Sequence, residues 1–127
     1  MDVYKELEEL CNGLTDHMRI EIEYRDRETM KNILGRTYFY GLNYKRHPVN
    51  PDKVRNCVIL LNEKIRCTEC MQRGVLWHEV CHCIPWINEG RSDGHSSAFY
   101  RRLWSKPLCA FYSICAEFWF GLLDAFD

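Results

Sequence analysis

Hydrophobic and polar residues follow two different periods along this chain, and the periods divide it into helical and extended segments. In residues 2–14 the apolar positions recur every three or four residues, which predicts an amphipathic helix ending near Asn12-Gly13. Residues 18–24 alternate apolar and polar side chains, a pattern typical of a half-buried strand. Residues 37–42 and 57–61 are rich in β-branched and aromatic side chains and predict two further strands.

The second half of the chain has a helical pattern. Residues 68–87 predict one helix, and residues 97–123 predict a second that is broken near Pro107. Two prolines mark residues 43–52, between the second and third strands, as a loop. We therefore expect an α+β fold with an N-terminal helix, a small three-stranded sheet and C-terminal helices.

The helix predicted over residues 68–87 carries an HExxH motif, formed by His78, Glu79 and His82. Histidines four residues apart on a helix leave the same face, so their imidazoles can occupy two corners of a tetrahedral zinc site. Glu79 lies one step around the helix, where it can reach a metal-bound water without binding the metal. The motif therefore indicates a zinc site with a general base beside it.

A third ligand must come from outside this helix. His95 follows His82 by thirteen positions and is the favoured candidate, while Glu117 is the alternative. The glycine and histidine that a metzincin needs three and six positions after its second histidine are replaced by Pro85 and Asn88, which excludes that class. With three protein ligands, a fourth position stays open for water, as in catalytic zinc sites.

Two segments around the motif resemble the SprT-like (Spartan-type) zinc metalloproteases. Residues 78–87 hold HExxH followed by apolar residues with a tryptophan, and residues 94–99 place a histidine four positions before a phenylalanine, as in that family. A strand ending in an asparagine, residues 58–62, precedes the motif in the family as it does here. The resemblance is strongest over residues 57–104. It departs at Ser96-Ser97, where the family has Gly-Pro; serine is a good helix N-cap, so we expect the next helix to begin normally.

The resemblance implies a zincin-like fold with one catalytic Zn²⁺ ion and endopeptidase activity. His78, His82 and His95 would hold the ion, and Glu79 would act as general base in peptide hydrolysis. The resemblance also implies a protein substrate attached to DNA. Tyr100 and Tyr112 are open candidates for stabilising the oxyanion. Two alternatives stay open: a zinc protease with a narrow protein substrate and no need for DNA, and a non-catalytic zinc-containing protein-interaction domain.

Composition agrees with one intracellular domain. A chain of 127 residues suits a single core, and we expect residues 1–127 to form one SprT-like domain without a C-terminal zinc ribbon. Charged residues interrupt any N-terminal apolar run, so we expect no signal peptide and a location in the cytoplasm, nucleus or nucleoid. The eight cysteines are then expected to be reduced. Cys67 and Cys70 form a single CxxC pair, which Cys57, Cys109 or Cys115 could complete into a metal site, although no spacing indicates it.

Positive charge is concentrated in the middle of the chain. Residues 31–73 carry nine Lys/Arg and three Asp/Glu, a net charge of +6, although the whole chain has a net charge of −1. Tyrosines and a phenylalanine accompany these cations, and such mixtures bind single-stranded nucleic acid through phosphates and stacked bases. An ordinary solvated surface is the alternative reading. The candidate contacts to single-stranded or damaged DNA are Arg36, Lys45, Arg46, Lys53 and Arg55.

Residues 108–123 form a strongly apolar run. The run is short for a membrane span and contains Glu117, so we expect no membrane insertion. Packing over the sheet or the active helix is the favoured role. A homodimer interface is the alternative, because Phe118, Trp119 and Phe120 cover more than one face of a helix.

Overall fold

A computed structural model describes residues 1–40 and 55–126 and shows an α+β arrangement with a small mixed sheet. The helices are α1 (Val3–Cys11), α2 (Arg27–Met30), α3 (Glu69–Glu89), α4 (Ser97–Trp104) and α5 (Pro107–Phe126). The strands are β1 (Ile20–Arg25), β2 (Gly35–Tyr40) and β3 (Asn56–Asn62), and 3₁₀ turns cover His17–Arg19 and Glu63–Cys67. The expected fold class is confirmed at this level, including the helix break just before Pro107.

The three strands are ordered β1-β3-β2, with β3 parallel to β1 and antiparallel to β2. Ile59 of β3 pairs with Ile22 on one side and with Thr37 on the other. Because side chains alternate across a strand, these three residues project from the same face of the sheet. β2 therefore lies at an edge of the sheet and brings Thr37 into line with the apolar core.

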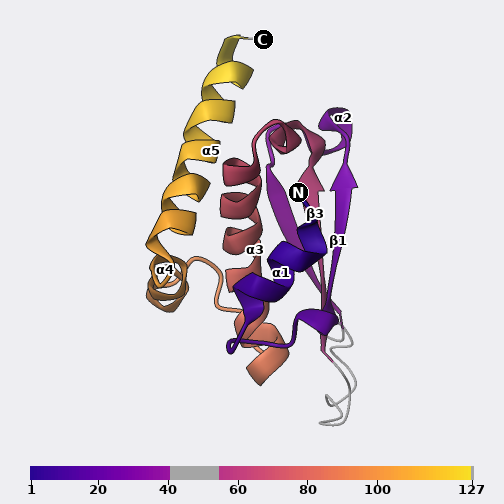
Figure 1. Ribbon diagram of the computed structural model, residues 1–127, viewed down its shortest axis with the longest axis vertical. Helices are drawn as coiled ribbons and strands as arrows, with labels where there is room; N and C mark the ends of the chain where they lie inside the picture. The colour runs from indigo at the N-terminus through magenta and orange to yellow at the C-terminus, as the bar shows by residue number, and fades with distance from the viewer. Residues whose placement is uncertain (41–54, 127) are drawn as a thin grey trace.

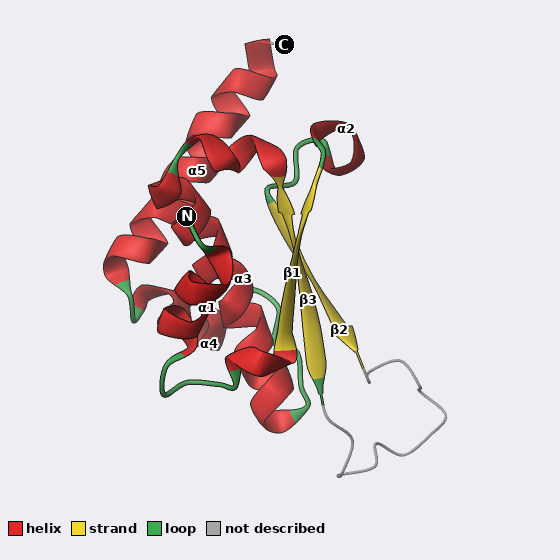
Figure 2. Ribbon diagram, turned by 45° about the vertical axis from the view of Figure 1, so that its right-hand side comes forward, coloured by secondary structure: helices red, strands yellow, loops and turns green. Residues whose placement is uncertain are grey.

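Helices cover one face of the sheet and leave the other to solvent (Figures 1 and 2). On β1, Ile20 and Ile22 are buried while Glu21 and Glu23 are exposed, which identifies the covered face. Figure 1 shows α3 between the sheet and α5, so the molecule has a sheet layer, a middle helix and an outer helix. The middle position explains why α3 is apolar on almost all sides, as expected for a helix buried between two layers.

Two buried tryptophans attach α3 to its neighbours. The indole N–H of Trp77 donates to the carbonyl oxygen of Leu103 in α4 at 2.8 Å. The indole N–H of Trp86 donates to the carbonyl oxygen of Asn56 at the start of β3 at 3.2 Å. Each bond satisfies a polar group inside the core, so each side chain contributes both burial and a fixed orientation.

A glycine allows α5 to approach α3 closely. A Cβ atom at Gly74 would lie 2.4 Å from the backbone nitrogen of Ser113 and 2.5 Å from the carbonyl carbon of Tyr112. Real Cβ atoms do not approach backbone this closely, so any larger residue would push the helices apart. The crossing fixes how far α5 stands above α3, and His78 lies one turn after it.

Several boundaries differ from the prediction. The first strand begins at Ile20 instead of residue 18, because the Asp16 carboxylate accepts from the backbone N–H of Met18 at 3.0 Å and holds a 3₁₀ turn there. β2 begins two residues earlier than predicted, at Gly35, and α3 runs two residues further, to Glu89. The predicted loop over residues 43–52 lies outside the described residues.

Asn62 holds the turn between α2 and β2, a feature that the sequence did not predict. Its buried amide donates to the carbonyl oxygens of Lys31 at 3.2 Å and Ile33 at 3.0 Å, and its side-chain oxygen accepts from the Lys64 backbone N–H at 3.0 Å. The asparagine at the end of this strand therefore joins β3 to the turn before β2.

Among the helices in the described part of the chain, none is long and apolar enough to cross a bilayer.

Candidate metal centre and active site

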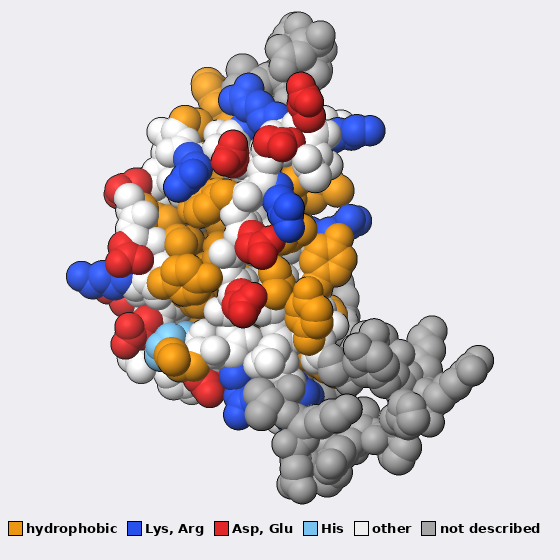
Figure 3. Space-filling view, turned by 90° about the vertical axis from the view of Figure 1, so that its right-hand side faces the viewer, with side chains coloured by type: hydrophobic (Ala, Val, Ile, Leu, Met, Phe, Trp, Pro, Cys, Tyr) orange, Lys and Arg blue, Asp and Glu red, His pale blue; other side chains and the backbone are white. Residues whose placement is uncertain are grey.

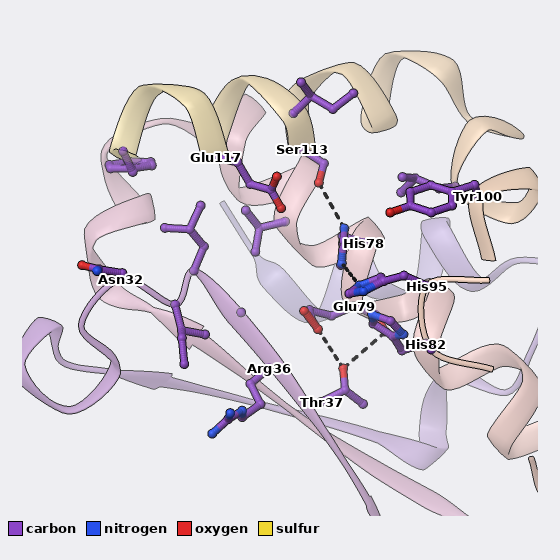
Figure 4. A pocket seen from close by; sticks show the side chains of 18 of the residues that line it. Asn32, Arg36, Thr37, His78, Glu79, His82, His95, Tyr100, Ser113 and Glu117 are labelled. Carbon is purple, nitrogen blue, oxygen red and sulfur yellow. Dashed lines mark hydrogen bonds between the residues drawn. The ribbon is translucent and has the colours of Figure 1, made fainter. Parts of the chain in front are cut away.

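Three histidine side chains converge at one end of a pocket beside α3 (Figure 4). His78 and His82 come from adjacent turns of α3, and His95 comes from the loop before α4. One ring nitrogen from each lies within 4.8 Å of the others. The Nε2 atoms of His78 and His95 are 3.3 Å apart. The structure thus brings together the three residues predicted as metal ligands.

The spacing fits a tetrahedral metal ion. With Zn–N bonds of about 2.0–2.1 Å, two ligand nitrogens on a tetrahedron are separated by roughly 3.4 Å. The observed distance of 3.3 Å between the Nε2 atoms of His78 and His95 agrees with this value. Burial lowers the pKa of His78 and of His82 to about 4, so both rings are neutral at pH 7. Neutral imidazole is the form that binds zinc.

An aromatic side chain supports all three rings. Phe99 is fully buried, and its ring stacks on that of His82 with centroids 4.4 Å apart. Its ring centroid is 5.0 Å from those of both His78 and His95. The Ser96 hydroxyl caps α4 by accepting from the Phe99 backbone N–H at 3.3 Å, which confirms the expected N-cap. The start of α4 therefore places Phe99 and His95 together.

The loop that carries His95 is tied to both neighbouring helices. The Arg102 guanidinium of α4 donates to both carboxylate oxygens of Asp93 at 2.8 Å. Its Nε donates to the carbonyl oxygen of Cys81 in α3 at 3.1 Å. Its Nη2 thus bonds to the loop while its Nε bonds to α3, and the planar guanidinium holds these two nitrogens at a fixed spacing. Arg102 thus holds the loop against the helix that supplies the other two ligands.

Glu79 lies beside the histidine cluster and is almost completely buried, with 5 % of its surface exposed. The pKa of its carboxyl is raised to about 7, mainly by burial. The Thr37 hydroxyl opposes this rise, and the nearby Glu117 contributes to it. That hydroxyl donates to Glu79 Oε2 at 3.0 Å and also lies 3.4 Å from the Glu79 carbonyl oxygen (Figure 4). A Cβ atom at Gly35 would lie 3.0 Å from Glu79 Cγ, so β2 leaves room for this side chain.

A cavity of about 940 Å³ opens onto this cluster. β2 and the turn before it form one wall, α5 forms another, and α4 contributes Tyr100. Figure 4 shows Glu117 and Ser113 entering from α5, with Ser113 beside His78. Apolar and polar side chains thus surround the Glu79 carboxyl and three convergent imidazoles, an arrangement suited to metal-assisted hydrolysis.

The model of the SprT-like family matches residues 1–107. The chain belongs to the SprT-like family. Membership indicates a metallopeptidase-like function, and the histidine cluster is consistent with the zinc dependence of such proteins. No curated protein and no solved structure matches the chain at a significant level.

Within this SprT-like chain the alternative third ligand is not part of the cluster. Among the described residues, the one group of three or more side chains suited to a metal consists of His78, His82 and His95. Glu117 lines the same cavity but stands outside that group. Of the two tyrosines considered for the oxyanion, Tyr100 lines the cavity, whereas the Tyr112 hydroxyl interacts with Cys70.

The cysteines form no second metal site among the described residues. All eight lie within those residues as free thiols. Cys67 is exposed, and its Sγ lies 3.3 Å from the carbonyl oxygen of Lys64. Cys67 is therefore the last residue of the 3₁₀ turn, and Cys70 lies in the first turn of α3. No third metal ligand lies near this pair among the described residues.

The predicted nucleic-acid contacts fall into two groups. Lys45, Arg46 and Lys53 lie outside the described residues. Arg36 is exposed on β2, and Figure 4 shows its side chain directed away from the histidines. Arg55 donates to the carbonyl oxygens of Ile87 and Asn88, both at 3.1 Å, so it caps the end of α3. These contacts stay a prediction.

The surface seen in Figure 3, on the β1 side of the molecule, carries Lys/Arg and Asp/Glu side chains interspersed with apolar ones. Neither sign of charge dominates this face. A face of mixed charge gives little long-range attraction for a polyanion such as DNA, because the contributions of opposite charges cancel.

Three side chains of the site were not identified from the sequence as site residues: Thr37, Phe99 and Ser113. Each contacts a residue of the HExxH motif from a different element, namely β2, α4 and α5. Only the alternation of β2, which places Gly35, Thr37 and Phe39 on its inner face, could have indicated one of them.

Proposed function

We propose that this SprT-like protein is a zinc-dependent endopeptidase with a zincin-like fold. The observation that carries the proposal is the buried carboxyl of Glu79 beside three convergent imidazoles. A purely structural metal site needs no base at its edge, and burying a carboxyl costs free energy even where, as here, a threonine hydroxyl donates to it. The zincin-like arrangement consists of the HExxH helix α3 packed beneath a mixed sheet whose edge strand borders the cavity.

His78, His82 and His95 would hold the ion. Zinc bound there would lower the pKa of a water molecule and polarise the scissile carbonyl. Glu79 accepts the proton of the attacking water and later donates it to the leaving amine. Thr37 holds the Glu79 carboxylate in one orientation through the 3.0 Å hydrogen bond. Tyr100, which lines the cavity, is our candidate for donating to the oxyanion.

The substrate is proposed to be a protein attached to DNA inside the cell. Single-stranded or damaged DNA would bind the enzyme and bring this substrate to the active site. Arg36, exposed on β2 near the cavity, supports this choice. A narrow protein substrate without DNA is the second candidate. It is favoured by Arg55, whose guanidinium is already bonded to the end of α3. The two candidates share the same hydrolytic site and differ only in how the substrate is brought to it.

The proposal is tested by incubating a DNA-binding protein with wild type and with Glu79→Gln, each with and without single-stranded DNA. We expect cleavage by wild type only, together with equal zinc content in both proteins, because the carboxamide cannot accept a proton. Cleavage only with DNA would support the DNA-attached substrate, and cleavage indifferent to DNA would support the narrow-substrate protease. Activity in Glu79→Gln would exclude the assigned mechanism. Zinc binding without any cleavage would favour a non-catalytic interaction domain.

A further inference from the structure

The outer helix α5 places a buried hydroxyl against the rear of one metal ligand. Ser113 has 4 % of its surface exposed, and its Oγ lies 3.4 Å from His78 Nδ1 (Figure 4). Within the described residues, this is the hydrogen-bond contact found for the Ser113 side chain. The family model matches residues 1–107, and Ser113 lies beyond them, so family membership assigns it no role.

The two ring nitrogens of His78 face different partners. Its Nε2 faces His95 Nε2 at 3.3 Å and therefore points into the cluster, while its Nδ1 points to Ser113 on α5. A neutral imidazole carries one proton, and the nitrogen without it has the lone pair that binds a metal. If the hydroxyl oxygen accepts from Nδ1–H, the proton stays on Nδ1 and the lone pair stays on Nε2.

Helix packing holds the hydroxyl in this place. The backbone nitrogen of Ser113 would lie only 2.4 Å from a Cβ at Gly74, so α5 approaches α3 closely one turn before His78. This close approach of the two backbones places the Cα of Ser113 beside the His78 ring. Ser113 is also buried, which limits the space into which its hydroxyl can turn.

We propose that Ser113 is a positioning residue that selects the Nδ1–H tautomer of His78 and directs its Nε2 toward the metal. The inference rests on the proposed zinc site and adds α5 to the elements that build it. Hydrogen-bond partners behind metal-binding histidines commonly change metal affinity by about 10–100-fold when they are removed.

The experiment compares wild type with Ser113→Ala by competition of zinc with a coloured chelator. We expect the dissociation constant to rise by about tenfold in the variant. The visible absorption spectrum of the Co²⁺-loaded variant should also differ from that of Co²⁺-loaded wild type, because the His78 ring can reorient without the hydroxyl. Ser105→Ala is the matched control. Its hydroxyl bonds to the Arg102 carbonyl oxygen at 2.6 Å, away from the cluster, so its zinc affinity should equal that of wild type.

Nitrogen NMR of histidine-labelled, zinc-loaded wild type gives a test that needs no variant at His78. It should show a protonated Nδ1 and a metal-bound Nε2 for that ring. A metal-bound Nδ1, or equal zinc affinity in wild type and Ser113→Ala, would overturn the inference. A wild type that binds no zinc would instead overturn the proposed function, so the two failures are distinguishable.

Discussion

His78 and Glu79 are adjacent in the chain, yet burial acts on them in opposite ways. It lowers the pKa of the His78 imidazole to about 4 and raises that of the Glu79 carboxyl to about 7. Both shifts favour the neutral form, as expected when a charge leaves water. In the protein without metal, one pocket therefore holds a neutral His78 imidazole, which can bind a cation, and a Glu79 carboxyl that is a weaker acid than usual. A divalent cation would reverse the second preference by attracting the carboxylate.

The Glu79 carboxyl should make the metal-free protein less stable as pH rises. Its pKa is about 7 in the fold against an ordinary value of 4.5, so its contribution is complete below pH 4.5 and is lost as pH rises toward 7. The shift corresponds to at most roughly 3 kcal/mol. In the presence of chelator, the free energy of unfolding of wild type relative to Glu79→Gln should fall across this interval, as measured by urea denaturation.

The comparison with Glu79→Gln is needed because the histidines act in the opposite direction. Their lowered pKa values favour the fold as pH rises from about 4 to 6.5, and this contribution is present in both proteins. Of the charges facing Glu79, Glu117 raises its pKa and Arg36 lowers it, and both remain in the variant. A constant difference between the two proteins from pH 4.5 to 7 would show that the carboxyl is not buried as described.

Residues of the site were predictable where their relation is local. His78, Glu79 and His82 lie within one turn of a helix, so their spacing alone determines which face they share. His95 was favoured over Glu117 because it follows His82 closely, and the resemblance to the family agreed with that choice. Thr37 and Ser113 needed the tertiary structure. Their contacts span 42 and 35 positions in the sequence, and no periodicity links residues so far apart.

At the scale of elements, the loop before α4 depends on Arg102. Arg102→Lys keeps the positive charge but offers a single nitrogen, which cannot bond to the Asp93 carboxylate and the Cys81 carbonyl in the arrangement that the guanidinium makes. His95 should then be held less firmly, and zinc affinity should fall by about tenfold. Arg101→Lys, the same change at the neighbouring exposed residue, is the control for chelator competition. Equal affinity in both variants would contradict the role given to the loop.

The crossing of α3 and α5 makes a second prediction at this scale. Gly74→Ala would force a Cβ to within 2.4 Å of the Ser113 backbone, so the helices must separate. Overpacking of this kind destabilises by about 1–3 kcal/mol. The matched control is Gly121→Ala, where a Cβ meets nothing within 4 Å and helix propensity should stabilise by up to about 1 kcal/mol. Thermal unfolding of both variants measures the contrast, and an unchanged Gly74→Ala would refute the close approach.

Elements with a long, regular pattern were predicted well, and those defined by single hydrogen bonds were not. The segments α1, α3 and α4 to α5 each show repeated apolar spacing, and each formed near its predicted bounds. The short helix α2 and the turn at Glu63–Cys67 contain too few residues for a period. Asn62 determines where that turn begins by accepting from the Lys64 N–H, a contact that no hydrophobic pattern encodes.

At the scale of the whole molecule, the face of α5 turned away from α3 is apolar and exposed. Residues of its inner face, such as Ala110 and Ala116, are buried, so packing against α3 confirms the favoured role of the C-terminal run. The opposite face presents large hydrophobic side chains that are between 49 % and 71 % exposed: Leu108, Phe111, Phe118 and Trp119. A continuous apolar stripe of this kind is typical of an interface.

The homodimer expected from this stripe stays a prediction, and light scattering during size exclusion can test it. A stable dimer needs about 1,200 Å² or more of buried surface. We expect α5, a helix of 20 residues, to reach this area only if adjacent elements also join the interface. Phe118→Ser removes a side chain that is 71 % exposed and should raise the dimer dissociation constant by at least about tenfold. Met18→Ser changes an equally exposed side chain, 79 % accessible, outside the stripe and should leave association unchanged. A wild type that remains monomeric at high micromolar concentration would show that the stripe does not join two copies of this chain.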